Sequence, residues 1–330
     1  MHAEYNGFFH IGMITRNERN AIIQHGTMTM VRYRVMQEVN GWSEWCITED
    51  AELGLRIFER GYEAAYVAKS YGQGLMPDTF LDFKKQRFRW AYGAMLIMRH
   101  HLASLLGLKK TCLTRGQRYH FLAGWLPWIA DGVNLLFNLG ALTWTTLMIL
   151  RPGVFNPPEA MFSMMPIVFF CFKVLKMFVL YRWRIKAGHR QCLAAGLAGL
   201  ALSHTIARAM VAGFLTKGIG FFRTPKMTSK NKIMQALSAC REELLFATAL
   251  LLGSYILGRT QDMSLFDLRM WRVVLVIQSI PFLAAIIVSI TGALPKIPAS
   301  LIGHMKPIDH YPATDRPQPP PPPIHIESPH

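Results

Sequence analysis

Long apolar stretches separated by basic segments restrict what this chain can fold into. Four stretches are long enough, or nearly so, to cross a lipid bilayer: 120–150, 161–181, 244–257 with its flanks, and 273–294. A spanning helix needs about 20 mostly apolar residues, because the bilayer core is about 30 Å thick. Of the 330 residues, 51% are hydrophobic and only 17% are charged. Part of the protein is therefore predicted to lie in lipid.

The excess of basic residues follows the same pattern. The chain has 36 Lys and Arg against 20 Asp and Glu, a formal charge of +16, and the basic residues gather at 84–118, 182–190 and 217–241. Basic segments that flank apolar spans mark the cytoplasmic side of a membrane. This bias accounts for most of the charge, so the expected partner is the lipid bilayer and not nucleic acid.

A fifth apolar stretch, 193–215, is predicted to be an interfacial or re-entrant helix. Basic clusters lie on both of its sides, so both of its ends are expected in the cytoplasm. If it spanned, His204 and Arg208 would lie at mid-membrane depth, where ionisable groups are costly. Four spans leave the C-terminus cytoplasmic, and the proline-rich residues 295–330 are expected to form a disordered tail.

The segment before the first apolar stretch has the mixed pattern of a soluble α/β piece. Apolar residues at helical spacing predict a helix over 51–60, with Gly61 as its C-terminal cap. Alternating residues predict a short strand over 62–70, and a basic helix is predicted over 78–99. Five cysteines have no paired spacing, which argues against a disulfide framework and a zinc site.

Two polar motifs predict a site for a sugar and a charged leaving group. Thr-Glu-Asp at 48–50 places a carboxylate in the first turn of a helix, where the helix macrodipole favours its ionised form. Alone, this pattern is more often simple helix-end electrostatics. Gln86, Arg89 and Trp90 occupy positions i, i+3 and i+4 of the basic helix, so they share a face. An arginine fork suits phosphate oxygens, and an indole can stack on a sugar ring.

These motifs, with Gly26-Thr27, Gly41-Trp42 and the sequence at 221–226, resemble a known family. They are similar to the C-terminal part of the processive, membrane-embedded glycosyltransferases of family 2, the cellulose synthase-like enzymes, over residues 1–294. The sequences at 16–28 and 85–93 look more narrowly like bacterial β-(1,3)-glucan synthases.

The resemblance implies a fold and a division of the chain. An α/β GT-A-like glycosyltransferase half-domain is expected over 1–92, and an amphipathic interface helix with a linker over 93–118. An α-helical transmembrane region of about four spans plus interfacial helices is expected over 119–294, with a cytoplasmic gating loop at 217–232. The tail at 295–330 completes the division.

The resemblance also implies roles for individual residues. Asp50 is expected to be the general base that deprotonates an acceptor hydroxyl. The residues expected to bind the donor diphosphate are Gln86, Arg89, Thr224 and Lys226. Those expected to contact the acceptor are His25, Gly26, Thr27, Glu49 and Trp90. Phe221 and Arg223 belong to the expected gating loop; Arg223 stands where the family usually has Val, and His25 where Cys is common.

The sequence contains no Asp-x-Asp, the motif that in this family holds a divalent metal on the donor diphosphate. The metal, Mg²⁺ or Mn²⁺, is therefore expected to have its ligands upstream, with none in this chain. On this basis the chain is expected to be the C-terminal portion of a synthase, through truncation, a split gene or a misassigned start.

The predicted activity is that of an inverting hexosyltransferase of the bacterial inner membrane, with its catalytic part and tail in the cytoplasm. It would transfer glucose from UDP-glucose to a growing β-glucan and help to extrude the polymer. Two other classes stay open. One is a catalytically incomplete subunit that binds and translocates polysaccharide while an upstream or separate half binds the donor. The other is a plain transporter or membrane scaffold.

Overall fold

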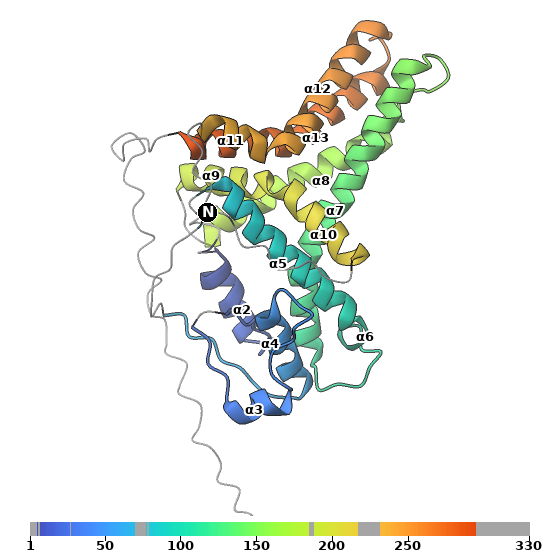
Figure 1. Ribbon diagram of the computed structural model, residues 1–330. Helices are drawn as coiled ribbons and strands as arrows, with labels where there is room; N and C mark the ends of the chain where they lie inside the picture. Colours follow the sequence, from blue (N-terminus) through green and yellow to red (C-terminus); the bar gives the residue numbers. More distant parts are fainter. Residues whose placement is uncertain are drawn as a thin grey trace, which may run out of the picture. The chain divides into compact units, whose positions relative to one another are not determined.

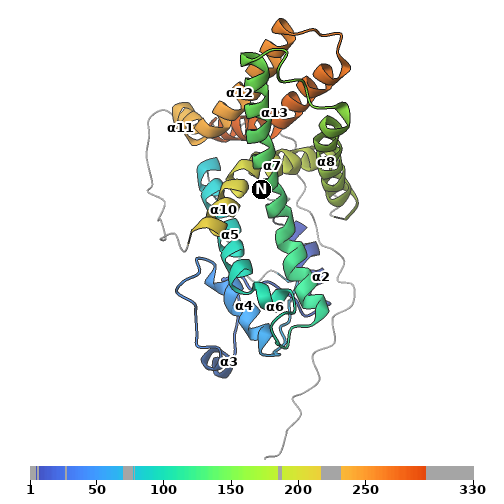
Figure 2. The ribbon, with the colours of Figure 1, turned by 90° about the vertical axis from the view of Figure 1, so that its right-hand side faces the viewer.

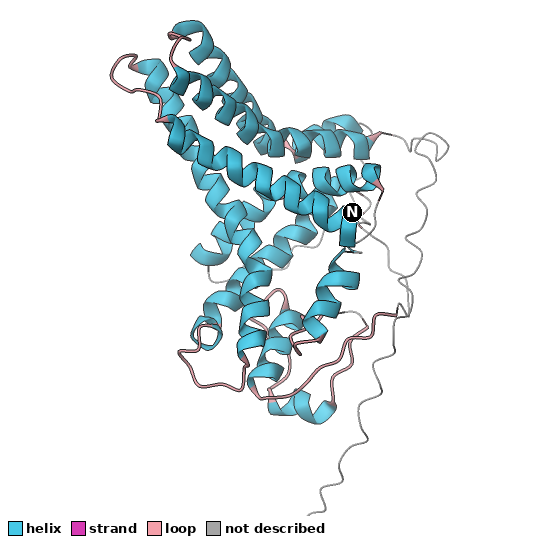
Figure 3. Cartoon of the chain, turned by 180° about the vertical axis from the view of Figure 1, so that it is seen from behind, coloured by secondary structure: helices cyan, strands magenta, loops and turns pink. Residues whose placement is uncertain are grey.

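The computed structural model describes residues 5, 7–26, 28–69, 77, 79–184, 188–216 and 232–294. All of them belong to one unit, Met1–Pro295. Every regular element in these residues is a helix, and Figure 3 shows no strand among them. The α/β character expected over 1–92 is therefore not confirmed by the described part of that segment.

The strand predicted over 62–70 is wrong as far as it is described, because residues 62–69 form no regular element. The backbone NH groups of Ala64 and Tyr66 donate to the side-chain oxygens of Asn20 and Asn17, at 2.9 and 2.7 Å. Alternate residues thus bond along one edge, as in a strand, but their partners are asparagine side chains. Residues 62–69 thus keep an alternating pattern of contacts, but the described residues contain no neighbouring strand with which they could form a sheet.

The helices around the two polar motifs are formed as predicted. After the short segments η1 (Phe8–Met13), α2 (Ile14–Asn17) and α3 (Tyr33–Glu38) come α4 (Glu49–Glu59) and α5 (Phe80–His100) (Figure 1). Gly61 follows α4 with a φ of +88°. Its NH donates to the Phe58 carbonyl and that of Tyr62 to the Ile57 carbonyl, which confirms the predicted glycine cap.

Helix α5 is buried on all sides over its C-terminal half. Residues 91–98 are all buried, and they pack against α7 (Arg115–Leu150) and α10 (Ser203–Leu215). Both views in Figure 1 and Figure 2 show α10 beside α5. Gly213 permits this approach, since a Cβ there would lie 2.7 Å from Met95 Cβ and 3.0 Å from the Tyr92 carbonyl oxygen. The helix that carries Arg89 and Trp90 is thus fixed to the apolar helices.

The remaining described helices include three long ones, α8 (Ala160–Val179), α12 (Arg241–Thr260) and α13 (Phe266–Ala293). The four shorter ones are α6 (Leu102–Leu105), η2 (Leu180–Arg184), α9 (His189–Ala201) and α11 (Lys232–Ala239). In α8 only Ser163 is buried, while many of its Met, Phe and Val side chains are exposed. An outer surface of this kind is stable in contact with lipid.

In the described part of the chain, four helical stretches are long and apolar enough to cross a membrane: Arg115–Leu150, Ala160–Trp183, His189–Leu215 and Phe266–Ala293. Three of the four predicted stretches are among them. The stretch predicted at 244–257, which lies in α12, is not, and His189–Leu215, predicted to be interfacial or re-entrant, is. The chain breaks at Leu202 between α9 and α10, which leaves two helices of 13 residues each. Each is about 20 Å long, shorter than a bilayer core of about 30 Å. The interfacial or re-entrant assignment of 193–215 stays a prediction.

The domain division also stays a prediction. Helix α5 continues across the expected boundary at 92, and α7 begins before the expected boundary at 118. The gating loop expected at 217–232 lies outside the described residues except for its last residue, and so does the tail at 295–330.

Candidate active site

Asp50 is half-buried in the first turn of α4. Its Oδ1 accepts a hydrogen bond of 2.8 Å from the backbone NH of Ala51. Its Oδ2 faces Gly26, since a Cβ at that glycine would lie 3.4 Å from this oxygen. The structure thus brings together two of the predicted site residues, and a larger side chain at position 26 would press on the carboxylate.

The start of α4 rests directly on α5. A Cβ built on Gly93 would lie 2.1 Å from Thr48 Oγ1 and 2.8 Å from Thr48 Cβ, so only glycine permits the approach. Gly93 follows Arg89 by four residues and Trp90 by three, and residues at this spacing share a helix face. The Thr-Glu-Asp motif is therefore packed against the helix that carries the second motif.

A row of aromatic rings connects the second motif to His25. The Tyr5 and Trp90 ring centroids are 6.1 Å apart in an edge-on arrangement, Tyr5 stacks on Phe9 at 6.5 Å, and Phe9 lies 5.5 Å from His25. The Tyr5 hydroxyl also donates to Gln86 Oε1. Sequence reasoning missed Tyr5 and Phe9. Their spacing at i and i+4, with Phe8 at i+3, was the available signal.

Trp90 is in contact with Arg87 as well as with Tyr5. The Arg87 guanidinium carbon lies 4.4 Å from the centre of the Trp90 ring, 5.0 Å from that of Tyr5 and 5.1 Å from that of Phe83. Such cation–π contacts hold an arginine over an aromatic face. The indole predicted to stack on a sugar therefore has a protein cation over its ring in this structure.

The electrostatic surroundings of His25 favour a neutral ring. Burial lowers its pKa, and Arg16 adds to that shift, while the Asp50 carboxylate and a backbone hydrogen bond at Ile23 oppose it. Phe8 packs against the ring at a centroid distance of 4.9 Å. A neutral imidazole can donate from one nitrogen and accept at the other, which suits contact with a sugar hydroxyl.

The other predicted site residues are placed as follows. Glu49 is exposed in the first turn of α4, and Arg89 is half-buried on α5. Five predicted residues lie outside the described part of the chain: Thr27, Phe221, Arg223, Thr224 and Lys226.

The described residues do not fit the divalent metal that the family resemblance implies. Among them, no three His, Cys, Asp or Glu side chains gather closely enough to hold a metal ion.

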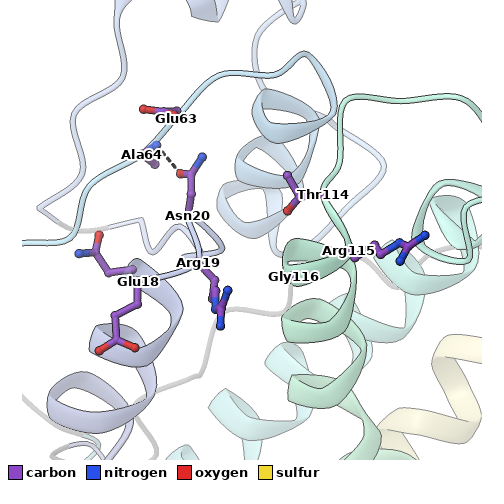
Figure 4. Close-up of a pocket in the computed structure, with 9 residues that line it drawn as sticks. Glu18, Arg19, Asn20, Glu63, Ala64, Thr114, Arg115 and Gly116 are labelled. Carbon is purple, nitrogen blue, oxygen red and sulfur yellow. Dashed lines mark hydrogen bonds between the residues drawn. The ribbon is translucent and has the colours of Figure 1, made fainter.

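A polar cavity of about 600 Å³ lies apart from these residues (Figure 4). Its walls are the turn after α2, the segment around Glu63 and the start of α7. The lining residues are Asn17, Glu18, Arg19, Asn20, Glu63, Ala64, Thr114, Arg115 and Gly116. None of the predicted site residues lines it.

The sequence of this chain is similar to a known protein family and to several known proteins. Residues 6–181 match the model of the family described as Glycosyl transferase family group 2. The chain is 34% identical over 80 residues to a cellulose synthase catalytic subunit (UDP-forming) of Xanthomonas axonopodis pv. citri (strain 306), across 24% of this chain and 11% of that protein.

Two further relatives are similar over slightly longer segments, of 86 and 85 residues. The identity is 30% over 86 residues with the probable glucomannan 4-beta-mannosyltransferase 6 of Oryza sativa subsp. japonica, across 26% of this chain and 15% of that protein. It is 28% over 85 residues with the probable glycosyltransferase YdaM of Bacillus subtilis (strain 168), across 26% of this chain and 20% of that protein. The matched segment thus spans between 11% and 20% of these three relatives.

Proposed function

Because the chain belongs to glycosyl transferase family group 2, we propose that it carries the acceptor and leaving-group half of a membrane-embedded sugar polymerase. The proposed reaction is inverting transfer of glucose from UDP-glucose to a growing β-glucan, with a β-(1,3)-glucan as the first candidate product. The apolar helices hold the catalytic part at the cytoplasmic face of a bacterial inner membrane and help to extrude the polymer.

One observation carries this proposal. The Asp50 carboxylate faces Gly26 at the start of α4, and that start is packed against α5 through Thr48 and Gly93. A proton acceptor and an arginine–tryptophan helix are thereby held in one rigid arrangement. Rigid placement of reacting groups lowers the entropic part of a reaction barrier.

In the proposed reaction, an acceptor hydroxyl oxygen attacks the anomeric carbon of the donor sugar on the side opposite the diphosphate. Asp50 accepts the hydroxyl proton as the new carbon–oxygen bond forms. The bond from the anomeric carbon to the β-phosphate oxygen breaks, and UDP leaves with its electron pair. Arg89 donates hydrogen bonds to the diphosphate as negative charge develops there.

The other residues orient the two substrates. Trp90 contacts the acceptor sugar ring, which requires that Arg87 share or leave the indole face that it now covers. His25 and Gly26 contact the acceptor beside Asp50, and Gln86 donates to hydroxyl or phosphate oxygens on the donor side. Thr224 and Lys226 act on the diphosphate from the expected gating loop.

The test is incorporation of labelled glucose from UDP-glucose by membranes that contain the complete enzyme. Asp50→Asn should lower polymer synthesis by about 10²- to 10⁴-fold, the usual range for loss of a general base. Glu44→Gln is the matched control, because Glu44 is exposed in the loop before α4 and its replacement removes one negative charge. Retained synthesis by the Asp50 variant would overturn the assignment.

The same assay decides between this function and that of a catalytically incomplete subunit. If the wild-type protein binds glucan oligosaccharides but transfers glucose only after a second, donor-binding chain is added, the subunit function is correct. Digestion of the product with linkage-specific glucanases identifies the polymer.

A further inference from the structure

His101 lies between two carboxylates of the helix that carries Asp50. It follows the last residue of α5 and is 7% exposed. Its Nε2 is 3.3 Å from Glu52 Oε1, and its Nδ1 is 3.0 Å from Glu59 Oε1. Glu52 and Glu59 are seven residues apart on α4, so they share one helix face. A single ring thus bridges two turns of α4.

This geometry requires a charged ring. Each ring nitrogen faces a carboxylate oxygen, and only the imidazolium form has a proton to donate from both nitrogens. A neutral ring would direct one lone pair at a carboxylate. In agreement, the hydrogen bonds and charges of Glu52 and Glu59 outweigh burial and raise the pKa of His101 to about 9.

Glu52 extends the same network to the loop before α4. It is 1% exposed, accepts a hydrogen bond of 2.6 Å from Ser43 and pairs with Arg56 at 2.8 Å. Arg56 also donates to the carbonyl oxygens of Val39 and Gly41. The loop, the middle of α4 and the end of α5 are therefore joined through buried charges.

Apolar side chains of α4 and α5, among them Leu55 and Met95, share one core cluster, but such packing is not directional. The close contact of Thr48 with Gly93 fixes one point of α4 on α5. His101 lies eight residues beyond Gly93, about 12 Å farther along the axis of α5. It supplies a second point of contact between the two helices. Two points define both the direction and the register of one helix on another. The relative placement of Asp50 and the Arg89–Trp90 face depends on that register.

We propose that His101 is a positioning residue of the transferase, which as an imidazolium between Glu52 and Glu59 fixes α4 on α5 and thereby aims Asp50 at the acceptor. The inference rests on the proposed function. The other charged or titratable groups near this site are His100 beside it on α5, Arg56 on α4 and Lys109 in the following loop.

Cys46 provides a readout of the register that does not need activity. This thiol is 4% exposed, lies 3.4 Å from Thr48 Oγ1 and packs with Ala94 and Met95 of α5. If α4 moves on α5, a maleimide should reach Cys46 faster. Cys240, also buried but in a separate cluster, reports global opening. The exposed Cys112 and Cys171 are replaced by serine in the parent protein.

The experiment compares His101→Gln with the parent in the full-length enzyme. Misplacement of a catalytic group by about 1 Å can cost about 100-fold in rate, so we expect kcat to fall by roughly 10- to 100-fold. The KM for UDP-glucose should change by less than about twofold, since α5 itself is unchanged. Maleimide labelling of Cys46 should accelerate while that of Cys240 does not. His101→Arg keeps the positive charge and several hydrogen-bond donors. It should therefore restore much of the parent kcat and much of the slow labelling of Cys46.

Two variants keep the inference falsifiable. Glu59→Gln removes one carboxylate far from Asp50 and should give the same two changes in weaker form. His189→Gln is the matched control, because His189 is exposed at the start of α9, a different part of the chain; it should change neither readout.

Three outcomes would overturn the inference: an unchanged kcat in His101→Gln, unchanged labelling of Cys46, or equal acceleration at Cys46 and Cys240. The last would mean that His101 serves only global stability. If the parent transfers no sugar, the proposed function has failed, and the labelling of Cys46 still decides whether His101 fixes α4.

Discussion

Thr48 fills the space that a side chain at Gly93 would need, with its Oγ1 2.1 Å from the position of that missing Cβ. The contact joins the helix with the proposed base to the helix with the proposed leaving-group residues. Substitutions at Thr48 or Gly93 should therefore change the rate of the reaction, although neither residue is proposed to contact the substrate.

Gly93→Ala should destabilise the protein by about 1–3 kcal/mol, the usual cost of overpacking a tight contact. It should also lower glucan synthesis, because α4 must shift. The measurement is the melting temperature of the detergent-solubilised protein together with glucose incorporation. A second change, Thr48→Gly, removes all three clashing atoms and should recover part of the lost stability.

Gly140→Ala on α7 is the control for this substitution. A Cβ there would meet nothing within 4 Å, so the variant should be neutral or gain up to about 1 kcal/mol from helix propensity. Equal effects at the two glycines would contradict the close contact at position 93.

Tyr5→Phe should weaken donor binding. The Tyr5 hydroxyl donates to Gln86 Oε1, and loss of such a bond costs about 1 kcal/mol. Gln86 should then sample more orientations, and the KM for UDP-glucose should rise a few-fold while kcat is kept. Tyr33→Phe is the control, since the hydroxyl of this exposed tyrosine accepts a hydrogen bond from Gln37 of its own helix. An unchanged KM in Tyr5→Phe would mean that the amide is held in place without the tyrosine.

Local patterns predicted the elements better than their partners. The two helices with the polar motifs and the Gly61 cap follow from residue spacing over one to three turns. The strand over 62–70 failed because alternation describes one edge, while the partners of Ala64 and Tyr66 are asparagines more than 40 residues earlier.

The candidate site divides in the same way. Motifs in the sequence proposed Asp50, Arg89 and Trp90 as site residues, and their roles stay predictions. The proximity of Gly26 to Asp50 was not predicted and comes from the structure alone. The bridge of His101 to Glu52 and Glu59 joins residues 49 and 42 positions apart, and no periodicity relates them. Contacts of this kind are set by how α4 packs on α5.

A charged pair joins two of the long apolar helices and should respond differently to single and double substitution. Lys173 Nζ on α8 is 2.7 Å from Asp131 Oδ1 on α7 and 3.1 Å from Ser203 Oγ on α10. Lys173→Met alone leaves the buried carboxylate without its donor, which should cost about 1–3 kcal/mol of stability. Lys173→Met with Asp131→Leu should lie closer to wild type, because no unpaired charge remains. The measurement is thermal unfolding. If the double variant loses as much stability as the two single variants together, the two residues are not coupled.

His101 should make stability depend on pH in a defined window. Its pKa is raised to about 9 from an ordinary value of 6.5, so the folded protein holds the proton more tightly than the unfolded chain does. The contribution is complete below about pH 6.5 and disappears as the pH rises through about 9. The melting temperature of the wild type should therefore exceed that of His101→Gln at pH 6.5, and the difference should shrink by pH 9.5. A difference that stays constant over this range would show that the ring acts through packing and not through its charge.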